Sequence, residues 1–213
     1  MRINIGCGQT PTPGWRNFDN SLSLKLARIP SLPGLLLKIR FLEQTQYDFI
    51  QFARSNQIEY GDATRALPLA DNSVEVLYSS HMLEHLDQTE VFLFLEESKR
   101  VLMSGGILRL AVPDIKKQVD QYLLTGDADQ FIEGALMCIP RPRTIAQRLK
   151  TLAVGTRHHQ WMYDGRSMCH LLSSHGFKNA KVVQPGETSI KNPGPLDLYE
   201  RLQESVYVET ENS

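Results

Sequence analysis

The stretch SSHMLEHL, residues 79–86, sets two histidines and a glutamate at a spacing that could support chemistry. His81, Glu84 and His85 form the pattern H-x-x-E-H. Residues four positions apart share one face of a helix, so the two histidines could bind one zinc ion there. One class of zinc proteases carries this spacing. A zinc-dependent hydrolase that uses His81, Glu84 and His85 is therefore one hypothesis for this chain.

The elements around the motif argue against a zinc-binding helix. Residues 74–78 follow a turn and read as a strand, so His81 comes just after a strand, where a helix need not yet be regular. The zinc signature needs both histidines inside one helix and a third ligand downstream, and no downstream acidic residue stands out for that role. We therefore predict no metal site. Glu84 and His85 would then only fix a loop through hydrogen bonds.

The composition is that of a globular protein with one sizeable core. Of the 213 residues, 41% are hydrophobic and 22% are charged. The net charge of −1 provides no global basic field, so we expect no nucleic-acid partner. Cys7, Cys138 and Cys169 form no CxxC pair, which indicates reduced thiols and a cytoplasmic protein. We expect neither a signal peptide nor a membrane-spanning segment.

Short apolar runs bounded by turn residues predict strands, and helical patterning separates most of them. The predicted strands are residues 1–5, 15–18, 58–60, 74–78, 107–112, 178–183 and 205–209. One helix is predicted from Asp87 to about Met103, where Gly105 and Gly106 should stop it. Another should begin at the cap Asp164 and end before Gly176, and residues 21–59 and 115–163 are mostly helical and irregular. This alternation argues for a mostly parallel sheet covered by helices.

Residues suited to ligand binding follow the predicted strands in order. In open sheets of this type, ligands bind beyond the carboxyl ends of the strands. The residues at these ends are Gly6 and Gly8, then Asp19, Asp62, His81 and Asp114. Because all of these strand ends would point at one crevice, they are the main functional signal in the sequence.

The glycine turn after the first strand indicates close approach of the backbone to a ligand. It is not the dinucleotide fingerprint G-x-G-x-x-G, because Pro11 occupies the third glycine position and spoils the helix start that a pyrophosphate needs. A nucleoside remains open, since the Asp19 carboxylate could accept hydrogen bonds from ribose hydroxyls. Asp62 could accept the exocyclic amine of a purine, and the amide of Ala63 could donate to the ring.

Taken together, INIGCGQTPTPGWRNFDNS, YGDATRALPLADNSVEVLYSSHMLEHL and ESKRVLMSGGILRLAVPD resemble the class I S-adenosylmethionine-dependent methyltransferases. The resemblance returns at HHQWMYD through SSHGF, and its nearest branch is of small type-11-like proteins that often accompany glycosyltransferases. It implies a Rossmann-like fold with a mostly parallel seven-stranded sheet, an antiparallel last strand and helices on both faces. A single domain over residues 1–213 is expected, with possible cap segments at 21–57 and 115–163.

The resemblance also implies S-adenosylmethionine (SAM) as cofactor and assigns binding residues. Gly6, Cys7 and Gly8 would line its methionine part, Asp19 would hold the ribose, Asp62 and Ala63 the adenine, and Ser79 or Ser80 with His81 would lie under the sulfonium. Asn4 replaces the family's usual acidic residue, and Thr10 replaces a further glycine. These departures keep open a non-catalytic nucleoside-binding module. Tight turns would be the ordinary structural explanation for Gly6, Gly8, Asp19 and Asp62.

Methyl transfer makes few demands on the protein, because the sulfonium already carries an activated methyl group. A base is needed only for an acceptor that must lose a proton. His81 is the first candidate, with Glu84 as its orienting partner, because histidine titrates near neutral pH. We expect His81 to be exposed to the crevice. His159, preferred over His158, is the second candidate, from the stretch HHQWMY.

The acceptor is expected to be a hydroxyl, or another heteroatom, of a small molecule or glycan. The Asn-Pro-Pro-Tyr type of motif used on nucleobase amines is absent after the fourth strand. Two segments, 21–42 and 134–163, contain cations and no acids, so they are either solvated helix faces or a cap that recognises an anionic acceptor. Residues 32–42, LPGLLLKIRFL, could lie on a membrane surface, although packing into the core is the favoured interpretation.

Overall fold

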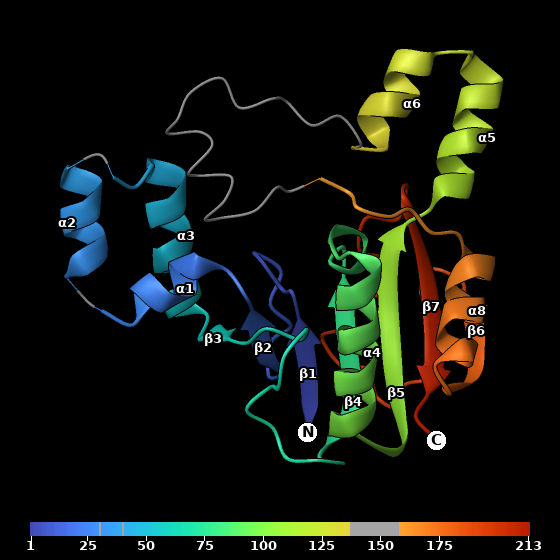
Figure 1. Ribbon diagram of the computed structural model, residues 1–213, viewed down its shortest axis with the longest axis horizontal. Coiled ribbons are helices and arrows are strands. Elements are labelled where there is room, and N and C mark those ends of the chain that lie inside the picture. Colours follow the sequence, from blue (N-terminus) through green and yellow to red (C-terminus); the bar gives the residue numbers. More distant parts are fainter. Residues whose placement is uncertain (30, 40, 137–157) are drawn as a thin grey trace.

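The computed structural model describes residues 1–29, 31–39, 41–136 and 158–213 (Figure 1). Its strands are β1 (Arg2–Ile5), β2 (Arg16–Asp19), β3 (Glu59–Tyr60), β4 (Val74–Ser80), β5 (Leu102–Pro113), β6 (Lys178–Val183) and β7 (Ser205–Glu211). They form one seven-stranded sheet in the order β3-β2-β1-β4-β5-β7-β6, in which β7 is antiparallel to both of its neighbours. The predicted mostly parallel sheet with an antiparallel last strand is confirmed.

Two helices cover one face of this sheet, α4 (Gln88–Val101) and α8 (Gly165–Ser174), both in front of the strands in Figure 1. Helix α4 begins at a capping box in which Asp87 accepts from the amides of the first turn. Its buried residues recur three to four positions apart, as an amphipathic helix requires. They join the apolar side chains of β1, β4 and β5 in the main core. The predicted helices and their starts are confirmed here.

Loops, rather than helices, cover the opposite face in the described part of the chain. There Val76 and Tyr78 of β4 pack against Ile190 and Leu196, which belong to the connection between β6 and β7, and against Trp15. The expectation of helices on both faces is therefore wrong for the described residues. The physical reason is the short link between β1 and β2, whose prolines leave it no room for a helix. This link is a turn, as expected.

Helix α4 ends earlier than its sequence predicts. It stops at Val101, and β5 begins at once, so Gly105 and Gly106 lie inside the strand rather than at a helix end. Gly105 has a φ of +73°, and a Cβ on Gly106 would lie 2.9 Å from the carbonyl oxygen of Met103. These glycines are required by a kink in the strand, where the chain passes close to itself. Glycine pairs serve both purposes, which explains the wrong boundary.

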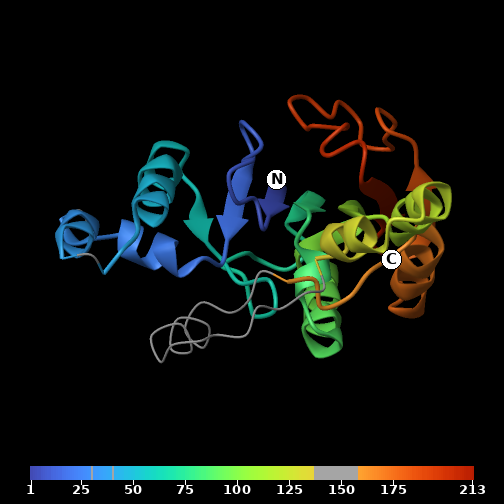
Figure 2. The ribbon, with the colours of Figure 1, turned by 90° about the horizontal axis from the view of Figure 1, so that it is seen from above.

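Two helical insertions lie on opposite sides of the carboxyl edge, the edge of the sheet at which the parallel strands end (Figures 1 and 2). One contains α1 (Leu22–Ala27), α2 (Leu32–Lys38) and α3 (Gln44–Ser55), and the other contains α5 (Ile115–Thr125) and α6 (Ala128–Gly134). They fall in the segments expected as caps, although residues 137–157 lie outside the described part. None of the described helices is long and apolar enough to cross a bilayer.

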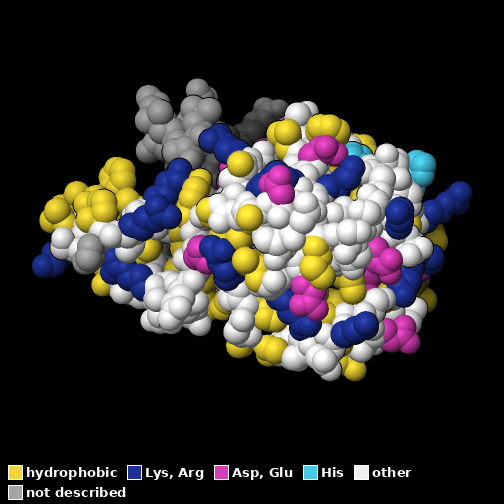
Figure 3. All heavy atoms as spheres, turned by 90° about the horizontal axis from the view of Figure 1, so that it is seen from below, with side chains coloured by type: hydrophobic (Ala, Val, Ile, Leu, Met, Phe, Trp, Pro, Cys, Tyr) yellow, Lys and Arg dark blue, Asp and Glu magenta, His cyan; other side chains and the backbone are white. Residues whose placement is uncertain are grey.

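The segment 32–42 packs into the core only in part. Leu42 is buried, but Leu35, Ile39 and Phe41 are 57%, 62% and 75% exposed, so the core-packing interpretation is wrong for these three side chains. The main contacts of helix α2 among the described elements are with α1 and α3 of its own insertion. Figure 3 shows apolar and basic side chains gathered at this end of the molecule.

A buried ion pair joins the loop-covered face to the sheet. Arg109 on β5 donates from Nη1 to the Glu209 carboxylate on β7 over 2.6 Å, and both side chains are almost fully buried. Glu209 also accepts hydrogen bonds from the Thr188 hydroxyl and the Ser189 amide, and Arg109 donates to the Glu187 carbonyl. Burial opposes ionisation of Glu209, but these donors hold its pKa below the ordinary value.

Replacing Glu209 with glutamine should therefore lower the free energy of unfolding by about 3–5 kcal/mol, because it leaves the buried Arg109 without a counter-charge. The matched control is Glu59→Gln, which removes the counter-charge from the partly exposed pair with Arg16 and should cost less than about 1 kcal/mol. Urea unfolding of both variants measures the difference. Equal losses would contradict this account of the pair.

Candidate active site

The turn after β1 is shaped by two glycines with left-handed backbones. Gly6 and Gly8 have φ values of +69° and +48°. The amides of Gly6 and Cys7 donate to the Phe18 carbonyl of β2, over 2.8 and 3.1 Å. A Cβ on Gly6 would lie 2.6 Å from Cγ of Met82, whereas a Cβ on Gly8 would meet no atom within 4 Å. Gly6 is thus needed for packing, and Gly8 leaves open space beside the backbone.

Asp19 joins the end of β2 to this turn. Its Oδ2 accepts from the Gly8 amide over 3.1 Å, and its Oδ1 accepts from the Ser21 amide over 2.8 Å. A carboxylate has room for about four hydrogen bonds, so two positions remain for donors such as ribose hydroxyls. The side chain is half-buried. Its place at the strand end agrees with the role assigned by the resemblance.

Asn4, which replaces the expected acidic residue, faces the proline-containing loop. Its Nδ2 donates to the carbonyl of Thr10 and to the hydroxyl of Thr12, each over 3.1 Å. Its buried Oδ1 has no hydrogen-bond partner in the described structure. An aspartate could not donate in this way, so the amide belongs to the particular fold of the loop. Thr10 in turn donates to Glu200, from the connection before β7.

Ser79, at the end of β4, ties the strand to its neighbour. Its hydroxyl donates to the Ile5 carbonyl over 2.9 Å, and the side chain is buried. The same hydroxyl would lie 3.9 Å from a Cβ on Gly6, so Ser79 stands directly behind the glycine turn. Ser80 projects to the opposite face of the sheet. Ser79 thereby positions the turn, whatever further contact it makes.

Asp62 and Ala63 follow β3 but form a turn of their own. Oδ1 of Asp62 accepts from both the amide and the hydroxyl of Thr64, and Oδ2 lies 3.6 Å from Arg65. Ala63 is buried in the main core. The described contacts of Asp62 are those of an ordinary aspartate turn. Adenine contact by Asp62 and Ala63 remains a prediction.

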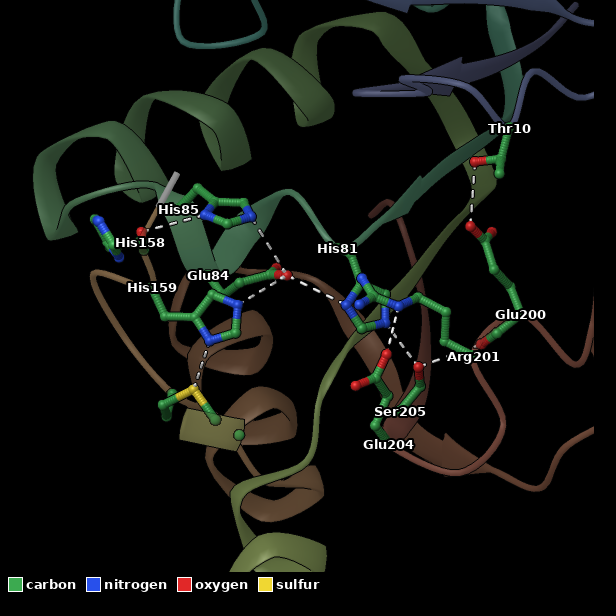
Figure 4. Close-up of polar contacts among 12 residues, drawn as sticks. Thr10, His81, Glu84, His85, His158, His159, Glu200, Arg201, Glu204 and Ser205 are labelled. Carbon is green, nitrogen blue, oxygen red and sulfur yellow. Dashed lines mark hydrogen bonds and ion pairs between the residues drawn. The ribbon is translucent and has the colours of Figure 1, made fainter. Parts of the chain in front are cut away.

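A second group of polar residues lies beneath the end of β4, around the 3₁₀ turn η1 (Leu83–His85) (Figure 4). The prediction that this stretch is no regular helix is confirmed. Oε1 of the fully buried Glu84 lies 3.4 Å from Nδ1 of His81 and 3.9 Å from Nε2 of both His85 and His159. Figure 4 shows His81 on one side of the carboxylate and the other two rings on the opposite side.

His81 is less exposed than its sequence position suggests. Only 6% of its side chain is accessible, so the expectation that it is exposed to a crevice is wrong. Its backbone has a φ of +48°, and its Nε2 lies 2.7 Å from Oγ of Ser205 at the start of β7. The left-handed backbone turns the ring beneath the strand end, between Glu84 and Ser205. The expected pairing of His81 with Glu84 is present.

His159 and His158 direct different groups toward this cluster. The ring of His159 faces Glu84, whereas His158 contributes its backbone carbonyl, 3.2 Å from Nδ1 of His85. Burial lowers the pKa of His159, although Glu84 acts in the opposite direction. Burial also raises the pKa of the Cys7 thiol to about 12, so Cys7 contributes backbone rather than a reactive thiolate.

Three residues at this edge have no counterpart in the sequence analysis: Met82, Glu200 and Ser205. Met82 packs behind Gly6, while Glu200 receives the hydroxyls of Thr10 and Tyr78. Glu200 and Ser205 reach the site from the far end of the chain through β7. No local pattern marks them, because their roles arise only from the pairing of β5 with β7.

Comparison with known families identifies the fold. Residues 42–110 match the model of a family described as a methyltransferase domain (Methyltransf_11). This stretch runs from the first insertion through β3, β4 and α4 into β5, and includes Asp62, Ser79 and His81. The chain contains a SAM-dependent methyltransferase domain. No curated protein sequence gives a significant match, and no comparison supports an association with glycosyltransferases.

Solved structures share the fold of this methyltransferase domain. A SAM-dependent methyltransferase from Thermotoga maritima, described as a possible histamine N-methyltransferase, is 16% identical with a TM-score of 0.53; the match covers 99% of this chain and 81% of that one. A SAM-dependent methyltransferase from Archaeoglobus fulgidus is 12% identical with a TM-score of 0.51, over 98% and 84% of the two chains. One from Methanosarcina mazei is 14% identical with a TM-score of 0.50, over 99% and 91%.

The glycine turn and Asp19 fit the cofactor of this family. The open space beside Gly8 lets a ligand approach the backbone closely, and Asp19 keeps acceptor positions free beside it. The proline-containing link forms no helix that would favour a pyrophosphate, which suits a nucleoside without phosphates. The glycine turn and Asp19, the residues predicted to bind the nucleoside, thus lie together at the carboxyl edge.

Gly8→Ala should weaken SAM binding by at least about 10-fold while the domain stays folded, because the added methyl group enters the open space beside the turn. Gly14→Ala is the matched control, since Gly14 also has a positive φ (+77°) and open space around its missing Cβ. Both variants carry a similar backbone strain of about 1–2 kcal/mol. Calorimetric titration with SAM compares them, and equal affinities would contradict the placement of the cofactor at Gly8.

Proposed function

We propose that this methyltransferase moves the methyl group of SAM to a hydroxyl, or another heteroatom, of a small molecule or glycan. The observation that carries the proposal is the position of His81. Its imidazole lies at the end of β4, between the Glu84 carboxylate and the Ser205 hydroxyl, and the next residue, Met82, packs against the glycine turn. A titratable ring beside the cofactor turn suits an acceptor that must lose a proton.

Binding and alignment are the first tasks of the chain. Gly6 and Gly8 would let the methionine part of SAM lie against the backbone, and Asp19 would accept hydrogen bonds from the ribose. SAM supplies an activated methyl group when bound, so the remaining task is to align the acceptor and exclude water. The two helical insertions flank the carboxyl edge and are suited to excluding water from it.

In this proposal His81 accepts the proton of the acceptor hydroxyl. The acceptor oxygen would take the position beside Nε2 that the Ser205 hydroxyl now holds. The proton would move to Nε2, and the negative charge of Glu84, 3.4 Å from Nδ1, would stabilise the imidazolium that forms. His159 faces the same carboxylate from the other side and is the second candidate for a role in turnover.

The acceptor class is supported by charge and by the strand-four sequence. No Asn-Pro-Pro-Tyr type of motif follows β4, which argues against nucleobase amines as acceptors. The first insertion contributes Lys25, Arg28 and Lys38 and no acid between residues 21 and 42. Lys25 lies over the ring of Tyr60 at the end of β3, so one of these cations stands at the carboxyl edge itself. An anionic acceptor, such as an acidic sugar, fits this charge.

SAM titration into chelator-treated protein tests the cofactor part of the proposal. The intact protein should bind one SAM per chain, and Asp19→Ala should weaken binding by at least about 10-fold, because ribose hydroxyls lose a charged acceptor. Asp48→Ala, at an exposed position on α3, is the matched control and should bind as the intact protein does. Binding unaffected by Asp19→Ala would overturn the assignment of the ribose site.

Turnover separates an enzyme from a non-catalytic nucleoside-binding module. With labelled SAM and a panel of hydroxyl compounds and acidic glycans, His81→Gln should lower kcat by about 10²–10⁴-fold, because a general base is lost. The Kd for SAM should stay unchanged. His159→Ala should also lower turnover without changing that Kd. Parallel losses of kcat and SAM affinity would count against a base role for either histidine.

The zinc-dependent hydrolase is the weaker alternative. Its motif needs His81 and His85 on one face of a regular helix, but η1 is a 3₁₀ turn and the two rings lie on opposite sides of Glu84 (Figure 4). His81 is also engaged by Ser205. The family match favours methyl transfer, and hydrolysis gains no support from His81, Glu84 and His85 as a set.

A further inference from the structure

The Glu84 carboxylate is buried without a hydrogen-bond partner among the described residues. An ionised carboxylate in such a place is costly unless a cation or several donors compensate it. Ring nitrogens of His81, His85 and His159 lie 3.4, 3.9 and 3.9 Å from Oε1 of Glu84. These three rings are therefore the candidates for compensating the charge of the Glu84 carboxylate.

The tautomer of His85 decides what it offers to Glu84. Its Nδ1 lies 3.2 Å from the backbone carbonyl oxygen of His158, which can only accept a hydrogen bond. Nδ1 therefore carries the hydrogen, and in the neutral ring Nε2 has a lone pair. That lone pair lies 3.9 Å from Oε1 of Glu84. Two acceptors thus face each other with no hydrogen between them.

His159 repeats this arrangement from another segment. Its Nδ1 lies 3.2 Å from the sulfur of Met162, a weak acceptor, and its Nε2 lies 3.9 Å from the same oxygen of Glu84. With the hydrogen on Nδ1, His159 also directs a lone pair at the carboxylate. The ring centroids of His85 and His159 are 5.2 Å apart and the ring planes are tilted by 59°, so the two rings do not stack. Both rings instead direct a nitrogen toward the same oxygen of Glu84.

The ligand atoms of Glu84, His85 and His159 all lie within 4.8 Å of one another. The 3.9 Å separations are too long for hydrogen bonds. Two ligands that each lie about 2.1 Å from a tetrahedral ion are about 3.4 Å apart, so a small contraction around an ion accounts for the spacing. We propose that Glu84, His85 and His159 bind a divalent transition-metal ion of the Zn²⁺ type.

The backbone holds these three ligands in place before any ion binds. The amides of Gln160 and Trp161 donate to the Glu84 carbonyl over 2.7 and 3.2 Å, which fastens the His159 segment to η1. The carbonyl behind His85 supplies the outer hydrogen bond that orients metal-binding histidines. Two histidines and one glutamate leave a fourth coordination position for water.

This set differs from the sequence motif, because His159 takes the place of His81. The third ligand that the motif lacks downstream is a histidine rather than an acid. The ion would tie η1 to the segment that leads into α8, just beneath the end of β4. The proposed site shares Glu84 and His159 with the proposed function, but its test measures metal binding by the chain itself and needs neither SAM nor turnover.

The test is calorimetric titration of Zn²⁺ into the chelator-treated full chain, with Co²⁺ absorption as a second readout. We expect one Zn²⁺ per chain and a visible Co²⁺ spectrum of a four-coordinate site with nitrogen and oxygen ligands. His85→Ala and His159→Ala should each weaken binding by at least about 100-fold. His158→Ala is the matched control, because only its backbone carbonyl faces the site, and it should bind as the intact chain does.

Glu84→Gln guards against variants that simply fail to fold. If the site binds metal, this variant should lose Zn²⁺ binding and yet, without metal, melt at a higher temperature than the metal-free parent, because a buried charge is removed. If the carboxylate is instead balanced by a protonated histidine, the parent should bind no stoichiometric Zn²⁺ and Glu84→Gln should melt lower. Absence of stoichiometric Zn²⁺ binding together with a lower melting temperature of Glu84→Gln would overturn the proposal. Zn²⁺ binding that survives both histidine variants would also overturn it. None of these measurements depends on SAM.

Discussion

The parallel pairing of β1 with β4 is the constraint on which the rest of the site depends. It sets Ile5 opposite Ser79, and the Ser79 hydroxyl fastens the end of β1 from the side. The glycine turn therefore begins at the level where β4 ends. The next pairing, of β1 with β2, brings Asp19 to the same level. The glycine turn, Asp19 and Ser79 reach the carboxyl edge through these two ladders, without a helix between β1 and β2.

On the sheet face that α4 and α8 do not cover, loops held by a buried ion pair take the place of helices. Residues 184–204 cover this face, and Glu209 anchors them. Its carboxylate accepts hydrogen bonds from the Thr188 hydroxyl and the Ser189 amide and also pairs with Arg109. The same connection contributes Glu200 to the carboxyl edge and leads into Ser205, the first residue of β7. The loop-covered face and the candidate site are therefore joined, because the connection that covers this face runs directly into Ser205, which contacts His81.

The sequence could predict the groups at strand ends, since strand order and direction follow from alternation and from the turn residues. The sheet, the caps of α4 and α8 and the position of Asp19 were accessible in this way. The burial of His81 was not, because it results from a left-handed backbone at one residue. Ser205 and Glu200 were also hidden, since a contact across more than 100 residues leaves no periodic pattern. The predicted end of α4 was wrong because glycine is the residue used both at helix ends and at kinks in strands, and Gly105 and Gly106 form a strand kink.

The place of β7 in the sheet has a consequence for the order in which the molecule is made. Among the described residues, β6 pairs only with β7, and β7 follows every other strand of the sheet along the chain. Until residues 205–211 have been synthesised, β5 keeps an open edge, and α8 with β6 has no sheet to join. An open strand edge invites pairing with other chains. We expect the nascent chain to complete its sheet only after β7 has been synthesised, with the burial of Arg109 and the placing of Ser205 among the later folding steps.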